Sequence, residues 1–158
     1  MNSVELFLPD EMATLAFAAK VRCLLPPGSL VFLHGNLGAG KTTFVRGFLR
    51  ASGYAGAVKS PTFTLVEEYT LEGLSLFHFD LYRLNDPEEL EWLGMRDYLN
   101  GAATCFIEWP ERGAGLLPVA DLEIRLQIEG TGRRAEVIAG TERGLNVVRK
   151  WAAKSLHL

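Results

Sequence analysis

The spacing of apolar side chains changes along the first third of the chain, and each change marks a new predicted element. Residues 3–8 alternate between polar and apolar side chains, which predicts a half-exposed strand at a sheet edge. Residues 10–25 carry apolar side chains at helical spacing, with Asp10 as the expected N-cap. Residues 29–33 form an apolar run typical of a buried strand, and residues 42–50 predict a second helix.

Strand patterns dominate the rest of the chain up to its last helix. Residues 64–69 and 74–80 are short β-rich runs separated by a turn, so they predict an antiparallel hairpin. Residues 103–107 are almost continuously apolar, which indicates a strand covered on both faces. Residues 121–129 and 134–139 alternate again and predict a second antiparallel pair.

Two more helices are expected in this half of the chain. The first has Asp86 as its N-cap and Pro87 as its first helical residue, and it ends at Asn100. The second is an amphipathic helix over residues 141–156. Without an internal repeat or a linker, these elements predict one α/β domain over residues 1–158, with a mixed parallel and antiparallel sheet flanked by helices.

Composition and charge narrow the classes of protein to consider. Hydrophobic residues make up 48% of the 158 residues and charged ones 22%, as in soluble globular proteins. The net charge of −3 argues against binding nucleic acid by overall charge, which leaves only a local basic patch. A secretory signal and an apolar run of about 20 residues are both missing, so we expect a cytoplasmic protein without membrane contact. Cys23 and Cys105 lack metal-type spacing and are expected to be buried free thiols.

A glycine-rich loop at residues 35–43 carries the clearest chemical signal. It has the pattern G-x-x-x-x-G-K-[ST] and lies between a predicted strand and a predicted helix, as a phosphate-binding loop requires. Its glycines let backbone N–H groups converge on a phosphate, Lys41 can reach the β- and γ-phosphates, and the Thr42 hydroxyl can bind Mg²⁺. We therefore predict a P-loop NTPase domain that binds a nucleoside triphosphate through Gly35, Asn36, Leu37, Gly38, Ala39, Gly40, Lys41, Thr42 and Thr43.

Two carboxylates at predicted strand ends are candidates to complete a magnesium site. Ligands of open α/β sheets gather at the carboxyl ends of the strands, where Asp80 and Glu108 both lie. Glu108 follows the more uniformly apolar strand, so we rank it first on the metal side. Asp80 would then hold a metal-bound water or orient the attacking one. The alternative for each is a carboxylate that only caps a neighbouring turn.

The segments next to these carboxylates leave two roles open. Thr62, in the tripeptide Ser60-Pro61-Thr62, either reaches the metal or γ-phosphate as part of a switch-like loop or belongs to a plain turn. Trp109 follows Glu108 directly and is either a lid over the site or an ordinary core residue.

Taken together, the motifs resemble the TsaE family, which supplies the ATPase of bacterial tRNA threonylcarbamoyladenosine biosynthesis. Asn36 departs from this family, which usually has Asp there; the position is variable and we expect the change to be tolerated. The resemblance runs in order from about residue 8 to 118 and is carried by GNLGAGKTT (35–43), KSPTFTLVEEY (59–69), HFDLYRL (78–84), DPEELEWLGMRDYL (86–99) and IEWPE (107–111).

The resemblance implies a function and a set of site residues. Members bind ATP and act with the TsaB and TsaD proteins, which install threonylcarbamoyl on adenosine 37 of tRNA, so contact with tRNA would be indirect. The residues implied in catalysis are Lys41, Thr62, Asp80 and Glu108, and those implied in holding Mg²⁺ are Thr42, Asp80 and Glu108. Outside the loop, the residues implied in binding the nucleotide are Glu11, Trp109, Glu111 and Arg133.

Other protein classes share the glycine-rich loop. A small-molecule kinase needs an acceptor pocket and usually an arginine-bearing lid, for which Arg112 is the one obvious candidate. A GTPase is disfavoured because no guanine-reading Asn-Lys-x-Asp sequence is present. A third alternative is a nucleotide-gated adaptor without catalysis. With no arginine placed as a finger, we expect slow hydrolysis by the isolated chain and faster hydrolysis with its partners.

Overall fold

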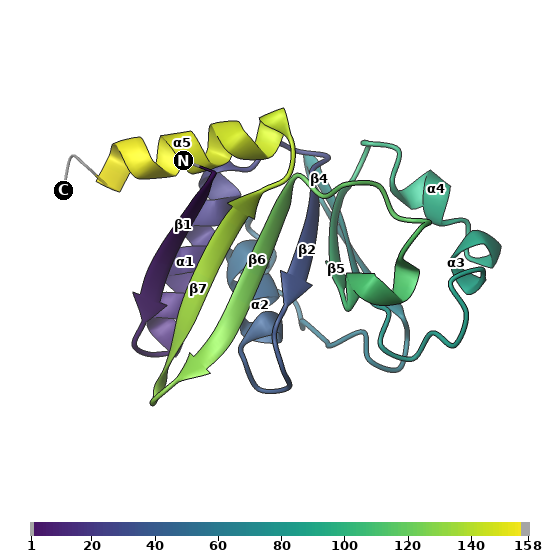
Figure 1. Ribbon diagram of the computed structural model, residues 1–158, viewed down its shortest axis with the longest axis horizontal. Helices are drawn as coiled ribbons and strands as arrows, with labels where there is room; N and C mark the ends of the chain where they lie inside the picture. Colours follow the sequence, from purple (N-terminus) through teal and green to yellow (C-terminus); the bar gives the residue numbers. More distant parts are fainter. Residues whose placement is uncertain (1, 156–158) are drawn as a thin grey trace.

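A single seven-stranded mixed sheet organises the chain, as the computed structural model of residues 2–155 shows (Figure 1). Its strands lie in the order β1-β7-β6-β2-β5-β4-β3. Strands β6, β2, β5 and β4 run parallel to their neighbours in that series, and the outer pairs are antiparallel. The strands are β1 (Ser3–Leu8), β2 (Leu30–His34), β3 (Val66–Leu71), β4 (Leu74–Asp80), β5 (Thr104–Glu108), β6 (Leu122–Glu129) and β7 (Gly132–Ala139).

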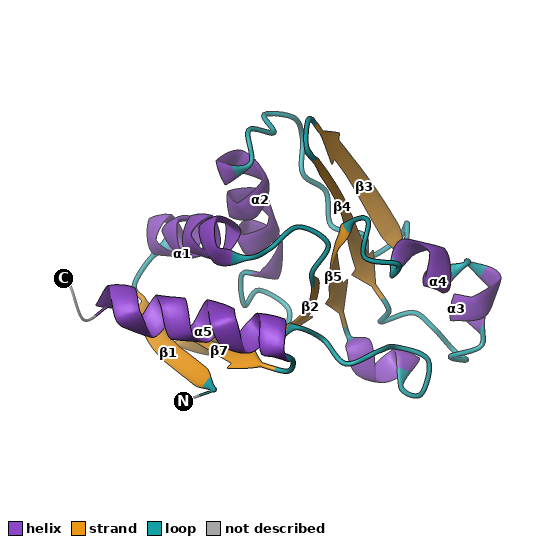
Figure 2. Cartoon of the chain, turned by 90° about the horizontal axis from the view of Figure 1, so that it is seen from above, coloured by secondary structure: helices purple, strands orange, loops and turns teal. Residues whose placement is uncertain are grey.

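Helices cover the sheet unevenly, with the longer ones gathered on one side (Figure 2). The helices are α1 (Glu11–Leu24), α2 (Lys41–Ala51), α3 (Glu89–Trp92), α4 (Met95–Tyr98) and α5 (Glu142–Ser155). Helices α1 and α2 pack closely on each other because Gly47 has no side chain. A Cβ there would lie 2.9 Å from Ala18 Cβ and 3.0 Å from Leu15 Cα. None of the helices within the described chain combines the length and apolar character that a bilayer crossing requires.

Two hydrophobic clusters hold the layers together, one on each face of the central strands. On the α2 side, the rings of Phe44 and Phe48 lie 5.8 and 4.8 Å from the ring of Phe106 on β5. On the opposite face, Phe79 and Ile107 belong to the second cluster, which includes residues of α3 and α4. All five residues of β5 are buried, which confirms a strand covered on both faces.

Most of the predicted elements are confirmed, including the edge strand β1 and both hairpins. The single helix predicted from Asp86 to Asn100 is wrong, because Gly94 adopts a left-handed conformation (φ 71°) and divides it into α3 and α4. Asp86 Oδ1 accepts a hydrogen bond from Glu88 N, but the first helix begins only at Glu89.

The two cysteines and the C-terminal helix only partly follow the predictions. Cys23 is exposed, contrary to prediction, because the buried stripe of α1 runs through positions 14, 17, 18, 21 and 24 and passes it by. Cys105 on β5 is buried as predicted. The amphipathic C-terminal helix is confirmed as α5, whereas its last predicted residue, Leu156, lies outside the described residues.

Candidate active site

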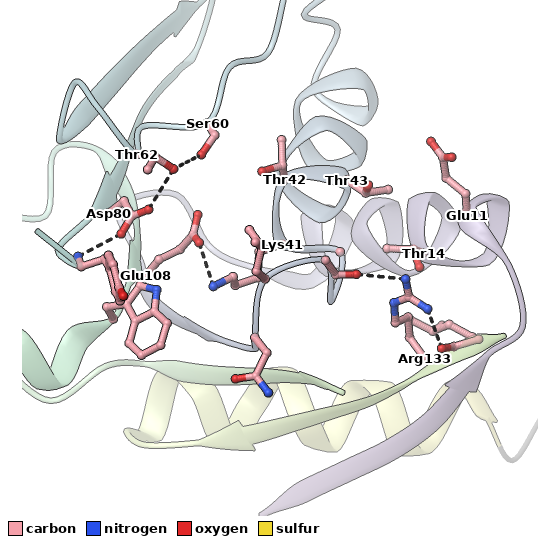
Figure 3. A pocket seen from close by; sticks show the side chains of 18 of the residues that line it. Glu11, Thr14, Lys41, Thr42, Thr43, Ser60, Thr62, Asp80, Glu108 and Arg133 are labelled. Carbon is pink, nitrogen blue, oxygen red and sulfur yellow. Dashed lines mark hydrogen bonds and ion pairs between the residues drawn. The ribbon is translucent and has the colours of Figure 1, made fainter. Parts of the chain in front are cut away.

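A cavity of about 700 Å³ opens where the glycine-rich loop joins β2 to α2 (Figure 3). Because β2, β5 and β4 are parallel neighbours, their carboxyl ends meet at this edge of the sheet. The first turns of α1 and α2, the loop before β3 and the turn between β6 and β7 complete the walls. The cavity is therefore built from segments that lie far apart in the sequence.

The glycine-rich loop keeps its shape through glycines at positions that other residues cannot occupy. Gly40 is the N-cap of α2 with φ 106°, a conformation that side chains rarely tolerate. A Cβ at Gly35 would lie 2.8 Å from the backbone oxygen of Leu126 on β6. No side chain caps the N-terminus of α2, so the N–H groups of its first turn are open to an anion in the cavity.

Lys41, Glu108 and His78 form a chain of contacts from the cavity into the sheet. Lys41 Nζ lies 3.1 Å from Glu108 Oε1, and His78 Nε2 lies 2.6 Å from Glu108 Oε2. The three side chains are 10%, 5% and 0% exposed, respectively. Burial by itself raises the pKa of Glu108, but the contacts with His78 and Lys41 outweigh burial and hold that pKa below its ordinary value. Glu108 is therefore a carboxylate anion at neutral pH.

Asp80 forms a second network with the loop before β3. Its Oδ2 accepts a hydrogen bond from Thr62 Oγ1 at 3.3 Å, and Ser60 Oγ lies 2.7 Å from that hydroxyl. Its Oδ1 accepts from Tyr82 N at 3.0 Å. Asp80 and Glu108 are direct partners in the register of β4 and β5, so two carboxylates stand side by side at the sheet edge. Figure 3 shows both of them near Lys41.

The far end of the cavity is lined by two charged residues, Glu11 of α1 and Arg133 at the start of β7. Arg133 donates from Nε to Ala39 O at 3.1 Å and from Nη2 to Gly38 O at 2.9 Å, which ties the start of β7 to the glycine-rich loop. Glu11 pairs with Arg46 of α2. Figure 3 places Glu11, Thr14 and Arg133 together, away from the two carboxylates. The cavity thus has two chemically different ends.

Trp109 lines the cavity next to the carboxylates. Its backbone is left-handed (φ 57°), which is rare and costly for a bulky residue and is typical of functional sites. Its ring centroid lies 5.0 Å from that of Tyr82 and 5.3 Å from Lys41 Nζ. Trp109 is half-buried and also packs against the second hydrophobic cluster, so it belongs partly to the core and partly to the wall of the site.

Most of the predicted site residues come together in this cavity. Gly35 and Ala39 belong to the loop but do not line the cavity, and Ala39 is 1% exposed. Glu111 lies exposed on the 3₁₀ helix η1 (Pro110–Gly113), outside the lining, so its role stays a prediction. Arg112, on the same short helix, lies over the ring of Tyr82. The predicted residues that line the cavity are Glu11, Asn36, Leu37, Gly38, Gly40, Lys41, Thr42, Thr43, Thr62, Asp80, Glu108, Trp109 and Arg133.

Sequence reasoning missed several residues of the site. Thr14 and Thr131 line the cavity without belonging to any motif quoted above, and Tyr82, which lies within HFDLYRL (78–84), was given no role. His78 was also missed, although a signal was present. Leu76, His78 and Asp80 are alternate residues of β4 and point to the same face of the sheet. A histidine at one of these inward positions is the signal that could have identified it.

The donor set of the cavity fits magnesium. Thr42, Thr62, Asp80 and Glu108 present hydroxyl and carboxylate oxygens, the hard ligands that Mg²⁺ prefers. In the part of the chain that the structure describes, no group of three or more His, Cys, Asp or Glu residues could hold a metal ion alone. Magnesium sites at nucleotides are of this kind, because one or two protein ligands act together with phosphate oxygens.

Comparison with known proteins returns the family that the motifs resemble. The family model described as threonylcarbamoyl adenosine biosynthesis protein TsaE matches residues 8–136. The tRNA threonylcarbamoyladenosine biosynthesis protein TsaE of Haemophilus influenzae is 47% identical over 153 residues, which are 94% of this chain and 97% of that relative. TsaE of Bacillus subtilis is 40% identical over 126 residues, 80% of this chain and 77% of that protein.

The fold has a similar solved counterpart. A crystal structure of Bacillus subtilis YdiB superposes with a TM-score of 0.83 at 28% identity, covering 97% of this chain and 96% of that one. The family match covers most of the chain, and the Haemophilus influenzae relative matches it over nearly its whole length. The chain therefore belongs to the TsaE family of threonylcarbamoyl adenosine biosynthesis proteins.

Proposed function

We propose that this chain is the magnesium-dependent ATPase of tRNA threonylcarbamoyladenosine biosynthesis, acting with TsaB and TsaD on the modification of adenosine 37. The observation that carries the proposal is the meeting of Lys41 and Thr42 with the carboxylates of Asp80 and Glu108 in one cavity. The names of the relatives support the pathway. The partners and the nucleotide are inferred, and tRNA is reached through the complex.

The two ends of the cavity give the nucleotide a direction. Phosphates belong at the glycine-rich loop, where the helix α2 N-terminus and Lys41 supply positive charge. The γ-phosphate would then point to the carboxylates, and the base would lie between Glu11 and Arg133 at the other end. Trp109 would cover the phosphate end and shield it from bulk solvent.

Hydrolysis requires a positioned water and relief of the charge that builds up on the phosphates. Thr42 and one of the two carboxylates would hold Mg²⁺, whose positive charge would supply part of that relief. Glu108 keeps Lys41 directed into the site through their 3.1 Å contact. Asp80 and the Thr62 hydroxyl would orient the attacking water, and their hydrogen bond supports this role because it holds the two groups together.

Among the described lining residues, no arginine lies at the carboxylate end of the cavity, where charge would build up on the phosphates. Arg133 is the one arginine among the described lining residues, and it lies at the end away from the carboxylates. An arginine finger contributes on the order of 10³ to 10⁵ in rate where it operates. We therefore propose that the isolated chain hydrolyses ATP slowly and that the partner proteins raise the rate. Arg112, the lid candidate of the sequence, lies over the ring of Tyr82 and does not line the cavity, which argues against a small-molecule kinase with an arginine-bearing lid.

Turnover of ATP, measured alone and with purified TsaB and TsaD, tests the proposal. We expect a low rate alone, a clear rise in the complex, and dependence on Mg²⁺ in both cases. Lys41→Ala should abolish nucleotide binding while the folding transition remains, because Lys41 lines the cavity and is not part of the core. A high rate alone that the partners leave unchanged would refute the partner-dependent account. ADP formed only with a small acceptor present would instead identify a kinase.

A further inference from the structure

Among the described residues near the site, His78 is a buried ionisable side chain that does not line the cavity. It lies on β4, two residues before Asp80, and is paired in register with Phe106 of β5. Its side chain is completely buried, and the preceding residue on the same face is Leu76. A polar ring is thus placed beneath the row of carboxylates, in apolar surroundings.

The contacts of His78 are one-sided. Its Nε2 lies 2.6 Å from Glu108 Oε2, whereas its Nδ1 has no hydrogen-bond partner among the described residues. Since a carboxylate oxygen can only accept, Nε2 must be the donor in this contact. A buried nitrogen without a hydrogen-bond partner destabilises the fold, whereas an apolar side chain at this position would carry no such cost. Packing alone therefore does not account for a histidine here.

We infer that His78 is a positioning residue that fixes the rotation of the Glu108 carboxylate. With Oε2 held from below by His78, Oε1 is turned toward Lys41 and the cavity. Glu108 would otherwise rotate about its last side-chain bond, since terminal torsions of this kind are broad. His78 acts only through Glu108, because its own ring does not reach the cavity.

The same arrangement explains how two acidic groups divide their roles. Asp80 is oriented by groups that lie above the sheet edge, namely the Thr62 hydroxyl and the backbone N–H of Tyr82. Glu108 is oriented from inside the sheet by His78. Movement of the loop that carries Thr62 would therefore disturb Asp80 and leave Glu108 in place. His78 gives the site one carboxylate whose direction does not depend on a loop.

The inference rests on the proposed ATPase function, and substitutions of His78 test it in the TsaB–TsaD-stimulated assay. His78→Leu removes the hydrogen bond, whereas His78→Gln keeps a donor near the position of Nε2. Loss of a group that orients a ligand typically costs about 10- to 100-fold in activity or metal affinity. We expect that loss in kcat for His78→Leu with KM for ATP little changed, because the phosphates are bound by the glycine-rich loop. His78→Gln should recover most of kcat.

Phe79→Leu is the matched control, since Phe79 is equally buried on β4 but faces the opposite cluster. It should lower the melting temperature and leave kcat unchanged. The inference is overturned if His78→Leu retains wild-type kcat, if His78→Gln is no better than His78→Leu, or if Phe79→Leu loses kcat equally. A wild-type protein without any ATP turnover would refute the proposed function itself, and the role of His78 in it.

Nitrogen-15 spectra of the histidine rings provide a readout that needs neither ATP nor a soluble Leu variant. In the wild-type protein we expect His78 to carry its proton on Nε2, with that proton slow to exchange. Glu108→Ala should shift the His78 signals and leave those of His34 unchanged, because His34 pairs with Glu123 instead. An unprotonated Nε2, or His78 signals that ignore the loss of Glu108, would overturn the inference.

Discussion

Replacing Arg133 by methionine should weaken nucleotide binding, because this side chain ties the start of β7 to the glycine-rich loop. Its guanidinium donates to the backbone oxygens of Ala39 and Gly38, at 3.1 and 2.9 Å. Methionine keeps the apolar stem and removes both donors. The loop would then lose an anchor from a strand that is remote in sequence, and nucleotide binding would have to order it.

The size of the effect follows from the contacts. Hydrogen bonds to a charged donor contribute about 1.5–3 kcal/mol when well buried. Arg133 is only half-buried, so we reduce this to about 0.5–1 kcal/mol for each bond. The two bonds together give about 1–2 kcal/mol, which raises the Kd for the nucleotide about 5- to 30-fold.

Binding of a fluorescent ATP analogue to the purified variants measures this Kd directly. Arg134→Met is the matched control, because Arg134 pairs with Glu129 and lies over the ring of Phe7 instead of contacting the loop. Its Kd should equal that of the wild-type protein. An unchanged Kd for Arg133→Met, or the same increase for Arg134→Met, would refute the assigned anchoring role.

Three further predictions concern the core and the carboxylate. Because the pKa of Glu108 is lowered in the folded protein, its carboxylate stabilises the fold at any pH above its ordinary pKa of 4.5. This contribution is lost as the pH falls through the pKa of the folded protein. The melting temperature of Glu108→Gln should therefore fall less steeply with acid than that of the wild type. An equal slope would contradict this. Burial raises the pKa of Cys105 to about 12, so iodoacetamide at pH 8 should label exposed Cys23 and spare Cys105, as peptide mass spectrometry would show. Gly47→Ala would place a Cβ 2.9–3.1 Å from atoms of α1. This crowding outweighs the gain in helix propensity and should lower the melting temperature by about 2–4 °C. A rise in the melting temperature would instead mean that α1 shifts easily to make room.

The sequence was a good guide wherever a signal is local. The apolar run of β5 and the alternation of the two hairpins predict the observed strands because side-chain period reports which faces are buried. The helix predicted from Asp86 failed for a related reason. Its start signals are strong, but Gly94 readily adopts the left-handed backbone conformation that interrupts a helix. Trp92 is 89% exposed, so its side chain adds little packing that would hold the helix together.

The site shows the same division between local and long-range information. The glycine-rich loop was predicted residue by residue, since its strand, turn and helix are adjacent in the chain. The contact of Glu108 with His78 was missed, because it depends on β4 and β5 being parallel neighbours in register. Arg133 was expected near the nucleotide from resemblance, and its hydrogen bonds to the loop became visible only in three dimensions.

By itself, then, the sequence determined a glycine-rich loop between a strand and a helix, a buried central strand and two acidic residues at strand ends. Only the tertiary structure decided that Lys41 meets Glu108, that Glu108 rests on His78, and that Asp80 is joined to Thr62. The physical reason is strand order. The strand order β2-β5-β4 brings together Lys41, Glu108 and His78, which are 30 or more residues apart, and local periodicity contains no record of which strands become neighbours.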